Sequence, residues 1–350
     1  MKNLGLEGVS ITGGSSWLNG SDSIGSLVGY NCGSISNCYS AGTVSVGAGL
    51  GGLVGLNAGS ISNCNSASTV FGETFLGGLV GYNKGTISNC YSTGAISGTR
   101  YLGGLVGENK AGSISDCYSI STVGGVYRSD TLGGLVGEND GGSISGCYAR
   151  GSVASGKESK YLGGLVGLNF SSISDCYSTG TVSGLSGSYT LGGLVGSNGG
   201  PLNHCYATGN VYGSSSLGGL VGVNDGNIIS NCYFYARSGL NNGYGTPLTD
   251  EQMKQQSSFV GWDFVWETAN GPNDIWAICG GISYPKLAWQ FIAGDLDNDK
   301  NVDFTDFALI GNKWMQADSN LYCGGSDLTG DGLVNWKDLA AFAENWLMDL

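Results

Sequence analysis

The sequence predicts an all-β fold: a parallel β-solenoid of eight coils, followed by a small α-helical, calcium-binding module at the C-terminus. Three observations lead to this prediction. The 350 residues include 66 Gly and only 4 Pro, a bias typical of a repetitive chain. A Leu-Val-Gly core recurs eight times between residues 24 and 233. After residue 294, oxygen-bearing side chains recur at nearly alternate positions in two separate loops.

The composition allows a packed core and argues against several kinds of partner. Hydrophobic residues make up 41% of the chain and charged residues only 12%, which is unlike a disordered sequence. The net charge is −13 at pH 7, and residues 291–350 hold 11 acidic against 3 basic residues. Because there is no basic run, we expect neither nucleic acid nor an anionic membrane surface as a partner. Acidity concentrated at one end indicates cation binding instead.

The sequence favours an extracellular or cell-surface location. No apolar stretch approaches the length of about 18 residues that a membrane span needs. The first residues lack the apolar segment of a signal peptide, so we expect either a removed leader or a longer parent protein. Scarce charge and abundant Ser, Gly, Asn and Tyr are the features that favour secretion.

Each repeat offers short β-prone runs separated by Gly or Asn-Gly turns, and these runs are too short to bury an apolar face alone. Stacking them as parallel strands about 4.8 Å apart buries that face and gives eight coils a length of roughly 38 Å. The Leu residues of the Leu-Val-Gly cores lie 26 to 30 residues apart, at Leu27, Leu53, Leu79, Leu105, Leu135, Leu165, Leu194 and Leu220.

An asparagine follows each Leu-Val-Gly core by two residues. These residues are Asn31, Asn57, Asn83, Asn109, Asn139, Asn169, Asn198 and Asn224. Asn tolerates turn geometry, and stacked amides form hydrogen bonds from coil to coil. We therefore expect a structural ladder, with a polar binding strip as the alternative.

One cysteine occurs in each coil, at Cys38, Cys64, Cys90, Cys117, Cys147, Cys176, Cys205 and Cys232. Zinc sites need ligands that converge at short spacings, and His204 is the only histidine. Neighbouring coils are close enough for disulfides, but a packed ladder of small buried thiols is the favoured prediction. The pairing of Cys32, Cys279 and Cys323 is left open.

A tyrosine follows most of these cysteines, at Tyr39, Tyr91, Tyr118, Tyr148, Tyr177, Tyr206 and Tyr233, with Asn65 interrupting the row. Alternation along a strand turns Tyr to the face opposite Cys, which predicts an aromatic strip on the outside. The strip either covers the backbone or offers a contact surface for glycans or another copy of the chain.

The string Leu-Gly-Gly-Leu-Val-Gly-x-Asn, with its partner Ser-Ile-Ser-x-Cys-Tyr-Ser, resembles the GLUG repeat of large bacterial surface proteins and adhesins over residues 24–233. The resemblance implies a secreted or surface-displayed β-solenoid with a structural or adhesive role. It implies no catalytic residues.

Three longer coils carry extra residues between equivalent strands, at 124–130, 155–160 and 184–189. Insertions in repeat proteins map to loops on one face, often the binding face. We expect these insertions to align into a ridge that contacts glycans or a protein partner. Its aromatic and cationic residues are Tyr127, Arg128, Lys157, Lys160 and Tyr189.

The repeat pattern is absent from residues 234–291. We expect this segment to form a junction between the solenoid, residues 1–233, and the C-terminal module, residues 292–350. The run from Thr249 to Gln252 has a capping-box pattern and predicts a short helix. Five aromatic residues follow, and we expect them to shield the last coil, because open solenoid ends need caps. An aromatic platform for carbohydrate is the alternative. The five are Phe259, Trp262, Phe264, Trp266 and Trp276.

Two 12-residue loops in the C-terminal segment have the ligand spacing of calcium sites. Positions 1, 3, 5, 7, 9 and 12 of the first loop are Asp295, Asp297, Asp299, Asn301, Asp303 and Asp306. In the second loop, the side chains of Asp327, Thr329, Asp331, Asn335 and Asp338 occupy positions 1, 3, 5, 9 and 12, and Leu333 offers its carbonyl at position 7. Oxygen ligands at this spacing predict two calcium ions.

The two loops are not equivalent at the turn. Lys300 occupies the position that Gly332 takes in the second loop. We therefore expect a more strained turn and a weaker first site.

A helical pattern follows each loop, over residues 304–314 and 336–347. Two loop-plus-helix halves resemble a type I dockerin over residues 294–347, and the resemblance implies docking onto a cohesin on another protein. Phe304-Thr305 and Trp336-Lys337 stand where the family more often has a small hydroxyl pair. This departure bears on the cohesin partner and leaves calcium binding intact.

These features predict a secreted structural or adhesive surface protein without enzymatic activity. A polysaccharide lyase is the rival, but acids in the solenoid are scattered, and Glu108 is followed in register by Glu138 and then by Leu168. A carbohydrate-binding or cohesin-docked scaffold component is the other alternative.

We also expect head-to-tail self-association into filaments, because the strand-like run of residues 8–12 has no Pro and no helix to cover it. The opposing explanation is that more coils precede it in a longer chain.

Overall fold

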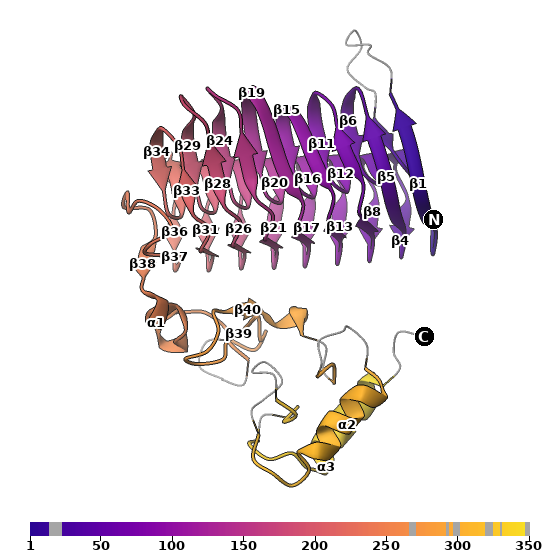
Figure 1. Ribbon diagram of the computed structural model, residues 1–350, viewed down its shortest axis with the longest axis vertical. Coiled ribbons are helices and arrows are strands. Elements are labelled where there is room, and N and C mark those ends of the chain that lie inside the picture. The colour runs from indigo at the N-terminus through magenta and orange to yellow at the C-terminus, as the bar shows by residue number, and fades with distance from the viewer. Residues whose placement is uncertain are drawn as a thin grey trace. The chain divides into compact units, whose positions relative to one another are not determined.

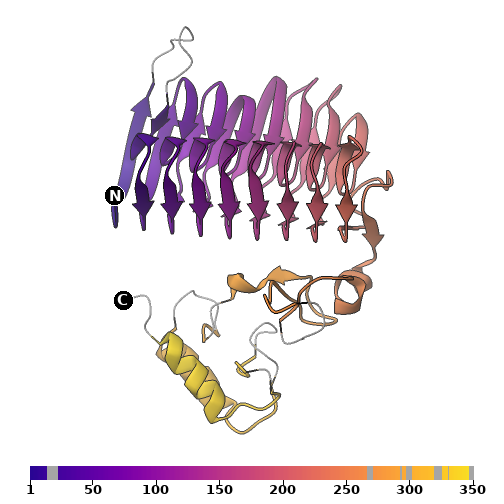
Figure 2. The ribbon, with the colours of Figure 1, turned by 180° about the vertical axis from the view of Figure 1, so that it is seen from behind.

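The computed structural model describes residues 1–13, 23–265, 271–291, 294–296, 302–318, 325–329 and 331–346. The chain forms two compact units, Met1–Thr249 and Asp250–Leu350. The first unit is a parallel β-solenoid of eight turns, as the sequence predicts, and Figures 1 and 2 show its coils stacked in chain order.

The coils contribute strands to three parallel sheets. The first sheet holds one strand per coil: β3 (Val28–Asn31), β7 (Val54–Asn57), β12 (Val80–Asn83), β16 (Val106–Lys110), β20 (Val136–Asp140), β25 (Val166–Asn169), β30 (Val195–Asn198) and β35 (Val221–Asn224). The second sheet holds the Ser-Ile-Ser strands: β4 (Ser34–Ser36), β8 (Ser60–Ser62), β13 (Thr86–Ser88), β17 (Ser113–Ser115), β21 (Ser143–Ser145), β26 (Ile173–Ser174), β31 (Leu202–Asn203) and β36 (Ile229–Ser230).

The third, wide sheet holds 22 strands. They are β1 (Gly5–Thr12), β2 (Ile24–Gly25), β5 (Tyr39–Ser45), β6 (Ala48–Gly51), β9 (Asn65–Ser66), β10 (Thr69–Phe71), β11 (Thr74–Gly77), β14 (Tyr91–Ser92), β15 (Ala95–Gly103), β18 (Tyr118–Ser119), β19 (Thr122–Gly133), β22 (Tyr148–Ala149), β23 (Val153–Ser155), β24 (Lys160–Gly163), β27 (Tyr177–Ser178), β28 (Val182–Gly184), β29 (Tyr189–Gly192), β32 (Tyr206–Ala207), β33 (Val211–Tyr212), β34 (Ser215–Gly218), β37 (Tyr233–Tyr235) and β38 (Thr246–Leu248).

Equivalent residues of successive coils pair in register, so each coil position becomes a column. Val28 pairs with Val54 and Asn31 with Asn57, and the same register continues to β35. The Leu-Val column is fully buried from Leu53 onward. The Gly-Gly pair that precedes each Leu-Val must lack side chains, because a Cβ at Gly77 would lie only 1.9 Å from the carbonyl oxygen of Val80.

The residue before each column cysteine turns the corner with a left-handed backbone. These residues have φ between 50° and 60°, and most are types that tolerate this conformation: Asn37, Asn63, Asn89, Asp116, Gly146, Asp175, His204 and Asn231. The single histidine is therefore a corner residue, and its Nδ1 lies 3.4 Å from the carboxylate of Asp175.

The asparagine column forms the predicted structural ladder. Each Nδ2 donates to the Oδ1 of the next coil at 2.7 or 2.8 Å, from Asn31 through to Asn224. The six members from Asn57 to Asn198 are fully buried. Buried amides that satisfy one another lock the coil register.

The cysteine column is the predicted ladder of free thiols. All eight side chains are buried and none is disulfide-bonded. The Cys64 thiol, for example, donates to the Ser62 carbonyl at 3.1 Å and accepts the backbone N–H of Cys38 at 3.3 Å. Cys32 is an exposed free thiol, Cys279 is disulfide-bonded, and Cys323 lies outside the described residues.

The tyrosine column stacks ring on ring. Consecutive rings from Tyr91 to Tyr206 lie 4.8–5.0 Å apart with interplanar angles of 8° or less. Each interior ring has a neighbour on both faces, and a ring face is the part of an aromatic side chain that a sugar would contact. Stacking therefore favours the structural role of this column.

The strand stack continues beyond residue 233, where the sequence placed the end of the solenoid. β38 pairs in parallel with β37, and Asn242 donates from Nδ2 to the carbonyls of Val221 and Gly222 at 2.8 and 3.1 Å. Residues up to Thr249 thus belong to the first unit and cover the open edge of its last coil.

The second unit begins with α1 (Asp250–Met253), which confirms the helix predicted from the capping box. It also contains the 3-10 helices η1 (Gln256–Ser258) and η2 (Ala288–Gln290), the antiparallel pair β39 (Trp276–Ala277) and β40 (Lys286–Leu287), and the helices α2 (Phe304–Asn312) and α3 (Trp336–Asn345).

The predicted aromatic cluster lies in this second unit. Phe259, Trp262, Phe264 and Trp276 are buried, and the ring centroids of Trp262 and Trp276 lie 4.2 Å apart. Trp266 lies outside the described residues. These side chains form a core of the unit itself, and the proposed shielding of the last coil stays a prediction.

Candidate calcium sites and surface sites

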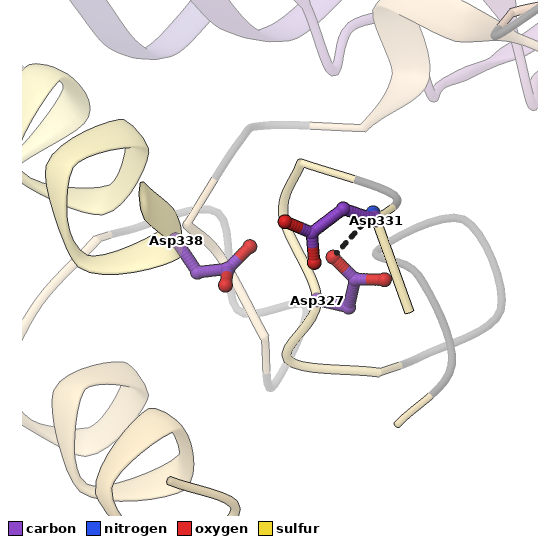
Figure 3. Close-up of side chains that lie close together, drawn as sticks. All are labelled: Asp327, Asp331 and Asp338. Carbon is purple, nitrogen blue, oxygen red and sulfur yellow. Dashed lines mark hydrogen bonds between the residues drawn. The ribbon is translucent and has the colours of Figure 1, made fainter. Parts of the chain in front are cut away.

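The second acidic loop brings three carboxylates together. Ligand oxygens of Asp327, Asp331 and Asp338 lie within 4.8 Å of one another. Figure 3 shows Asp327 and Asp331 coming from the loop and Asp338 from the start of α3. Asp327 and Asp338 are buried, and like charges so close repel unless a cation lies between them. The residues present therefore fit a hard divalent cation such as calcium.

Backbone groups hold these carboxylates in place. The Asp327 carboxylate accepts the N–H of Asp331 at 3.2 Å and that of Gly332 at 2.7 Å. Gly332 has φ +87°, a conformation that glycine adopts without cost. Lys337 donates to Asp331 at 2.8 Å, and this hydrogen bond lowers the pKa of the Asp331 carboxyl.

The start of α3 orients the remaining predicted ligands. Asn335 caps the helix by accepting the N–H of Lys337 at 2.9 Å, and Asp338 accepts the Asn335 N–H at 2.8 Å. Asp338 also accepts the Thr329 hydroxyl at 3.0 Å, while the Leu333 carbonyl accepts Nδ2 of Asn335 at 2.9 Å. All the predicted ligands of this loop thus form one connected hydrogen-bonded group.

The described part of the first loop repeats this arrangement. Asp303 caps α2 by accepting the N–H of Thr305 at 2.7 Å, and Asp306 accepts the Asp303 N–H at 2.9 Å. The buried Asp306 also accepts the N–H of Leu296 at 2.6 Å, and Asp295 is buried too. Asp297, Asp299 and Asn301 lie outside the described residues, as does Lys300, so the weaker first site stays a prediction.

A small apolar core joins the two halves. Val302 and Val334 hold position 8 of their loops, and both are buried with Ile310, Leu328 and Phe342. The two helices each end two residues earlier than predicted, at Asn312 and Asn345. The duplicated loop-plus-helix module of the sequence is therefore present.

The residues of the predicted ridge lie on the solenoid, and three of the five line one open pocket: Arg128, Lys160 and Tyr189. Asp130 and Glu158, which lie within the predicted insertions, line the same pocket, as does Arg100, which sequence reasoning missed. Arg100 belongs to a coil of ordinary length, and only the strand register, in which Arg100 pairs with Asp130, places it there.

Two glutamates stack in adjacent coils of the first sheet. Glu108 on β16 pairs directly with Glu138 on β20. Burial, together with the charge of Glu108, raises the pKa of Glu138 to about 7, and burial raises the pKa of Glu108 as well. The fold therefore shifts the pKa of both carboxyls upward, toward the protonated form.

This pair predicts that the solenoid is more stable at acidic than at alkaline pH. The stabilisation is complete below the unfolded pKa of about 4.3 and is lost as the pH rises through about 7. Partial solvent exposure of Glu138 reduces the expected effect to about 1–2 kcal/mol. Glu138→Gln should raise the midpoint of urea unfolding at pH 8 and flatten its dependence on pH between 5 and 8.

The control for this prediction is Glu73→Gln, at an exposed glutamate of an earlier coil. It should leave the pH profile of unfolding unchanged. A Glu138→Gln variant with the slope of the parent chain would contradict the prediction.

Two family models match the repeats and the C-terminal module. Residues 75–97, 98–124, 129–154 and 158–183 match the family described as the GLUG motif, and residues 293–344 match the dockerin type I domain. A search of the curated proteins finds no match. A solved structure called a "putative immunoglobulin A1 protease from Bacteroides ovatus" aligns with 18% identity over 77% of this chain and 87% of that chain, at a TM-score of 0.45.

No helix among the described residues is long and apolar enough to cross a membrane. GLUG repeats and a dockerin domain are both features of proteins that act outside the cell or at its surface. This chain thus carries GLUG repeats in an eight-turn parallel β-solenoid and a dockerin type I domain at its C-terminus.

Proposed function

We propose that this chain is a secreted, non-enzymatic structural protein whose solenoid is held at its place of action by docking of the C-terminal module onto a cohesin. The observation that carries this proposal is a pair of exposed aromatic side chains in equivalent places. Phe304 and Trp336 each follow the N-cap residue of a helix, and they are 76% and 68% exposed.

Aromatic residues are enriched among the side chains that carry most of the binding energy at protein interfaces, so Phe304 and Trp336 are the proposed contact residues. Because Phe304 and Trp336 are related by the duplication of the module, the module offers two similar contact faces. Phe304-Thr305 and Trp336-Lys337 stand where the family more often has a small hydroxyl pair, so we expect a cohesin with a more apolar recognition surface.

The solenoid suits a role as a rigid spacer or adhesive surface. Two buried apolar clusters and the amide ladder run through its successive coils. The disulfide at Cys279 supports secretion, since disulfides persist in oxidising compartments.

Docking is testable with a panel of recombinant type I and type II cohesin domains. Phe304→Ala combined with Trp336→Ala should weaken binding of the best cohesin by about 100-fold, because each is expected to act as a hot spot. Each single change should cost less, since the other face remains. Isothermal titration calorimetry with calcium present measures the loss.

Phe170→Ala is the matched control, because Phe170 is a half-exposed aromatic residue of the solenoid. It should leave cohesin affinity unchanged. Failure of every cohesin to bind the parent chain, or equal binding by the double variant, would count against this docking mode.

Head-to-tail self-association is a further prediction, and the edge strand β1 favours it. β1 pairs with β5 on one side, and within the described residues no strand pairs with its other edge. Such an edge recruits a further strand. Sedimentation as a monomer at high concentration with calcium present would argue against it.

A further inference from the structure

The three longer coils build one continuous ridge on the wide sheet. The N–H of Arg128 donates to the Lys157 carbonyl at 2.9 Å, and the N–H of Glu158 donates to the Ser186 carbonyl at 3.1 Å. The extra residues of each coil therefore lie on those of the next, although they lie about thirty residues apart in sequence.

A column of buried serines anchors this ridge. Ser129 and Ser159 each donate a backbone N–H to the hydroxyl of the next coil's serine, at 3.1 and 3.2 Å. Ser129, Ser159 and Ser188 are all buried. Buried hydrogen bonds between successive coils therefore fix the backbone of the ridge.

An open pocket of about 460 Å³ lies on this ridge. Its charged and aromatic lining residues come from four successive coils: Arg100, Arg128, Asp130, Glu158, Lys160 and Tyr189. Three cations face two carboxylates, so the lining carries a net charge of +1, whereas the whole chain carries −13. Lys157, on the same insertion, adds a further positive charge.

The acidic groups position the cations. The Asp130 carboxylate lies between Arg100, at 3.5 Å, and Lys160, at 3.1 Å. Its side chain is only 14% exposed, while that of Arg100 is 59% exposed. The carboxylate therefore lies beneath the two basic groups, which remain open toward solvent.

The second ion pair has the same consequence. Arg128 donates from Nε to Glu158 at 2.8 Å, so this hydrogen bond does not use the N–H groups of its terminal nitrogens. The Arg128 side chain is 67% exposed and lies over the ring of Tyr127, with 5.0 Å from guanidinium carbon to centroid. Tyr127 donates its hydroxyl to Glu158 at 3.1 Å. The Arg128 guanidinium is thus positioned by Glu158 and Tyr127 and keeps further N–H donors for a ligand.

Aromatic side chains flank these cations. Tyr189, on the third insertion, lines the pocket and is 41% exposed, and Tyr127, on the first insertion, is 55% exposed. Ring faces pack against the apolar faces of sugars, and Arg side chains bind carboxylate or sulfate groups in a bidentate manner. Both features occur here within a few coils.

We propose that this ridge pocket binds an acidic polysaccharide. Arg100, Arg128 and Lys160 contact the carboxylate or sulfate groups of the polymer, and Tyr127 and Tyr189 contact its sugar rings. The polymer runs along the ridge, since the lining residues come from four successive coils along the solenoid axis. A nucleic acid fits less well, because four basic residues on one ridge are few for a phosphate backbone.

The test is affinity electrophoresis and calorimetry of the full chain with calcium present. The probes are polygalacturonate as the carboxylated polymer, heparin as the sulfated polymer, neutral xylan and duplex DNA. We expect at least one of the two acidic polysaccharides to bind, with xylan and DNA at least about tenfold weaker. The polygalacturonate and heparin arms distinguish carboxylate from sulfate recognition.

Arg100→Gln with Arg128→Gln should weaken that binding by about tenfold or more, because two charge-assisted contacts are lost. Lys84→Gln with Lys110→Gln is the control, since it removes two exposed solenoid cations outside the pocket. The control should bind as the parent does. Equal losses in both variants, equal binding of DNA, or no binding of either acidic polymer would overturn the proposal.

This site is independent of docking by the C-terminal module. The Arg100→Gln, Arg128→Gln variant should bind a cohesin as tightly as the parent chain, and the Phe304→Ala, Trp336→Ala variant should keep its polysaccharide affinity. A loss of both activities in either variant would indicate misfolding, which circular dichroism of the solenoid checks directly.

Discussion

Removing calcium is expected to unfold the C-terminal module and leave the solenoid folded. The carboxylates of Asp327, Asp331 and Asp338 crowd within 4.8 Å, and without a cation their repulsion opposes the folded loop. Among the described residues, the apolar core of the module is small, with five buried side chains. At a calcium concentration 1,000 times its dissociation constant, each site stabilises the fold by about 4 kcal/mol. For so small a core, that contribution decides whether the module is folded.

Hydrogen exchange of the full chain with and without EDTA measures this effect. Amides in α2 and α3 should lose protection on chelation, and amides of the Asn ladder should keep it. Asp295→Ala with Asp327→Ala should reproduce the EDTA result in the presence of calcium. Glu344→Gln, an exposed acid on α3, is the matched control and should change nothing. Unchanged exchange in α2 and α3 after chelation would show that calcium does not hold the module.

Most of the solenoid could be predicted because its physics is local and repeated. Short, repeated β-strands have few ways to bury an apolar face. Stacking them in register buries that face and also pairs each strand with its equivalent in the next coil. The ladders of Asn109 and Cys117 follow from that register, since each residue meets its own equivalent one coil away. The calcium loops were predictable for a related reason, because ligand spacing within one loop is short-range information.

The parts that sequence reasoning missed depend on contacts without a repeat. Asn242 covers the carbonyls of Val221 and Gly222, yet it lies in a segment that resembles no coil. Arg100 joins the ridge pocket through Asp130, although its own coil has no insertion. Neither contact leaves a periodic signal, so only the folded arrangement reveals them. This is why the pocket was predicted in part and the end of the solenoid was placed too early.

Changing an interior member of the amide ladder should destabilise the solenoid more than any surface change. Asn109 is fully buried, accepts from Asn83 at 2.7 Å and donates to Asn139 at 2.8 Å. Asn109→Ala removes both bonds and leaves a buried donor and a buried acceptor without these partners. Each unsatisfied group costs about 1–3 kcal/mol, so we expect a loss of roughly 3–5 kcal/mol in the free energy of unfolding.

The end of the same ladder supplies the control. Asn224 accepts from Asn198 at 2.7 Å and lies in the last coil of the ladder, where it is part-exposed. Asn224→Ala takes one acceptor from Nδ2 of Asn198, which still donates to the Gly200 carbonyl at 2.7 Å, so it should cost less than half as much as Asn109→Ala. Urea unfolding followed by far-UV circular dichroism compares the two variants. Similar losses at both positions would mean that the ladder contributes through local turns alone, because only coupling from coil to coil makes the interior member more important than the terminal one.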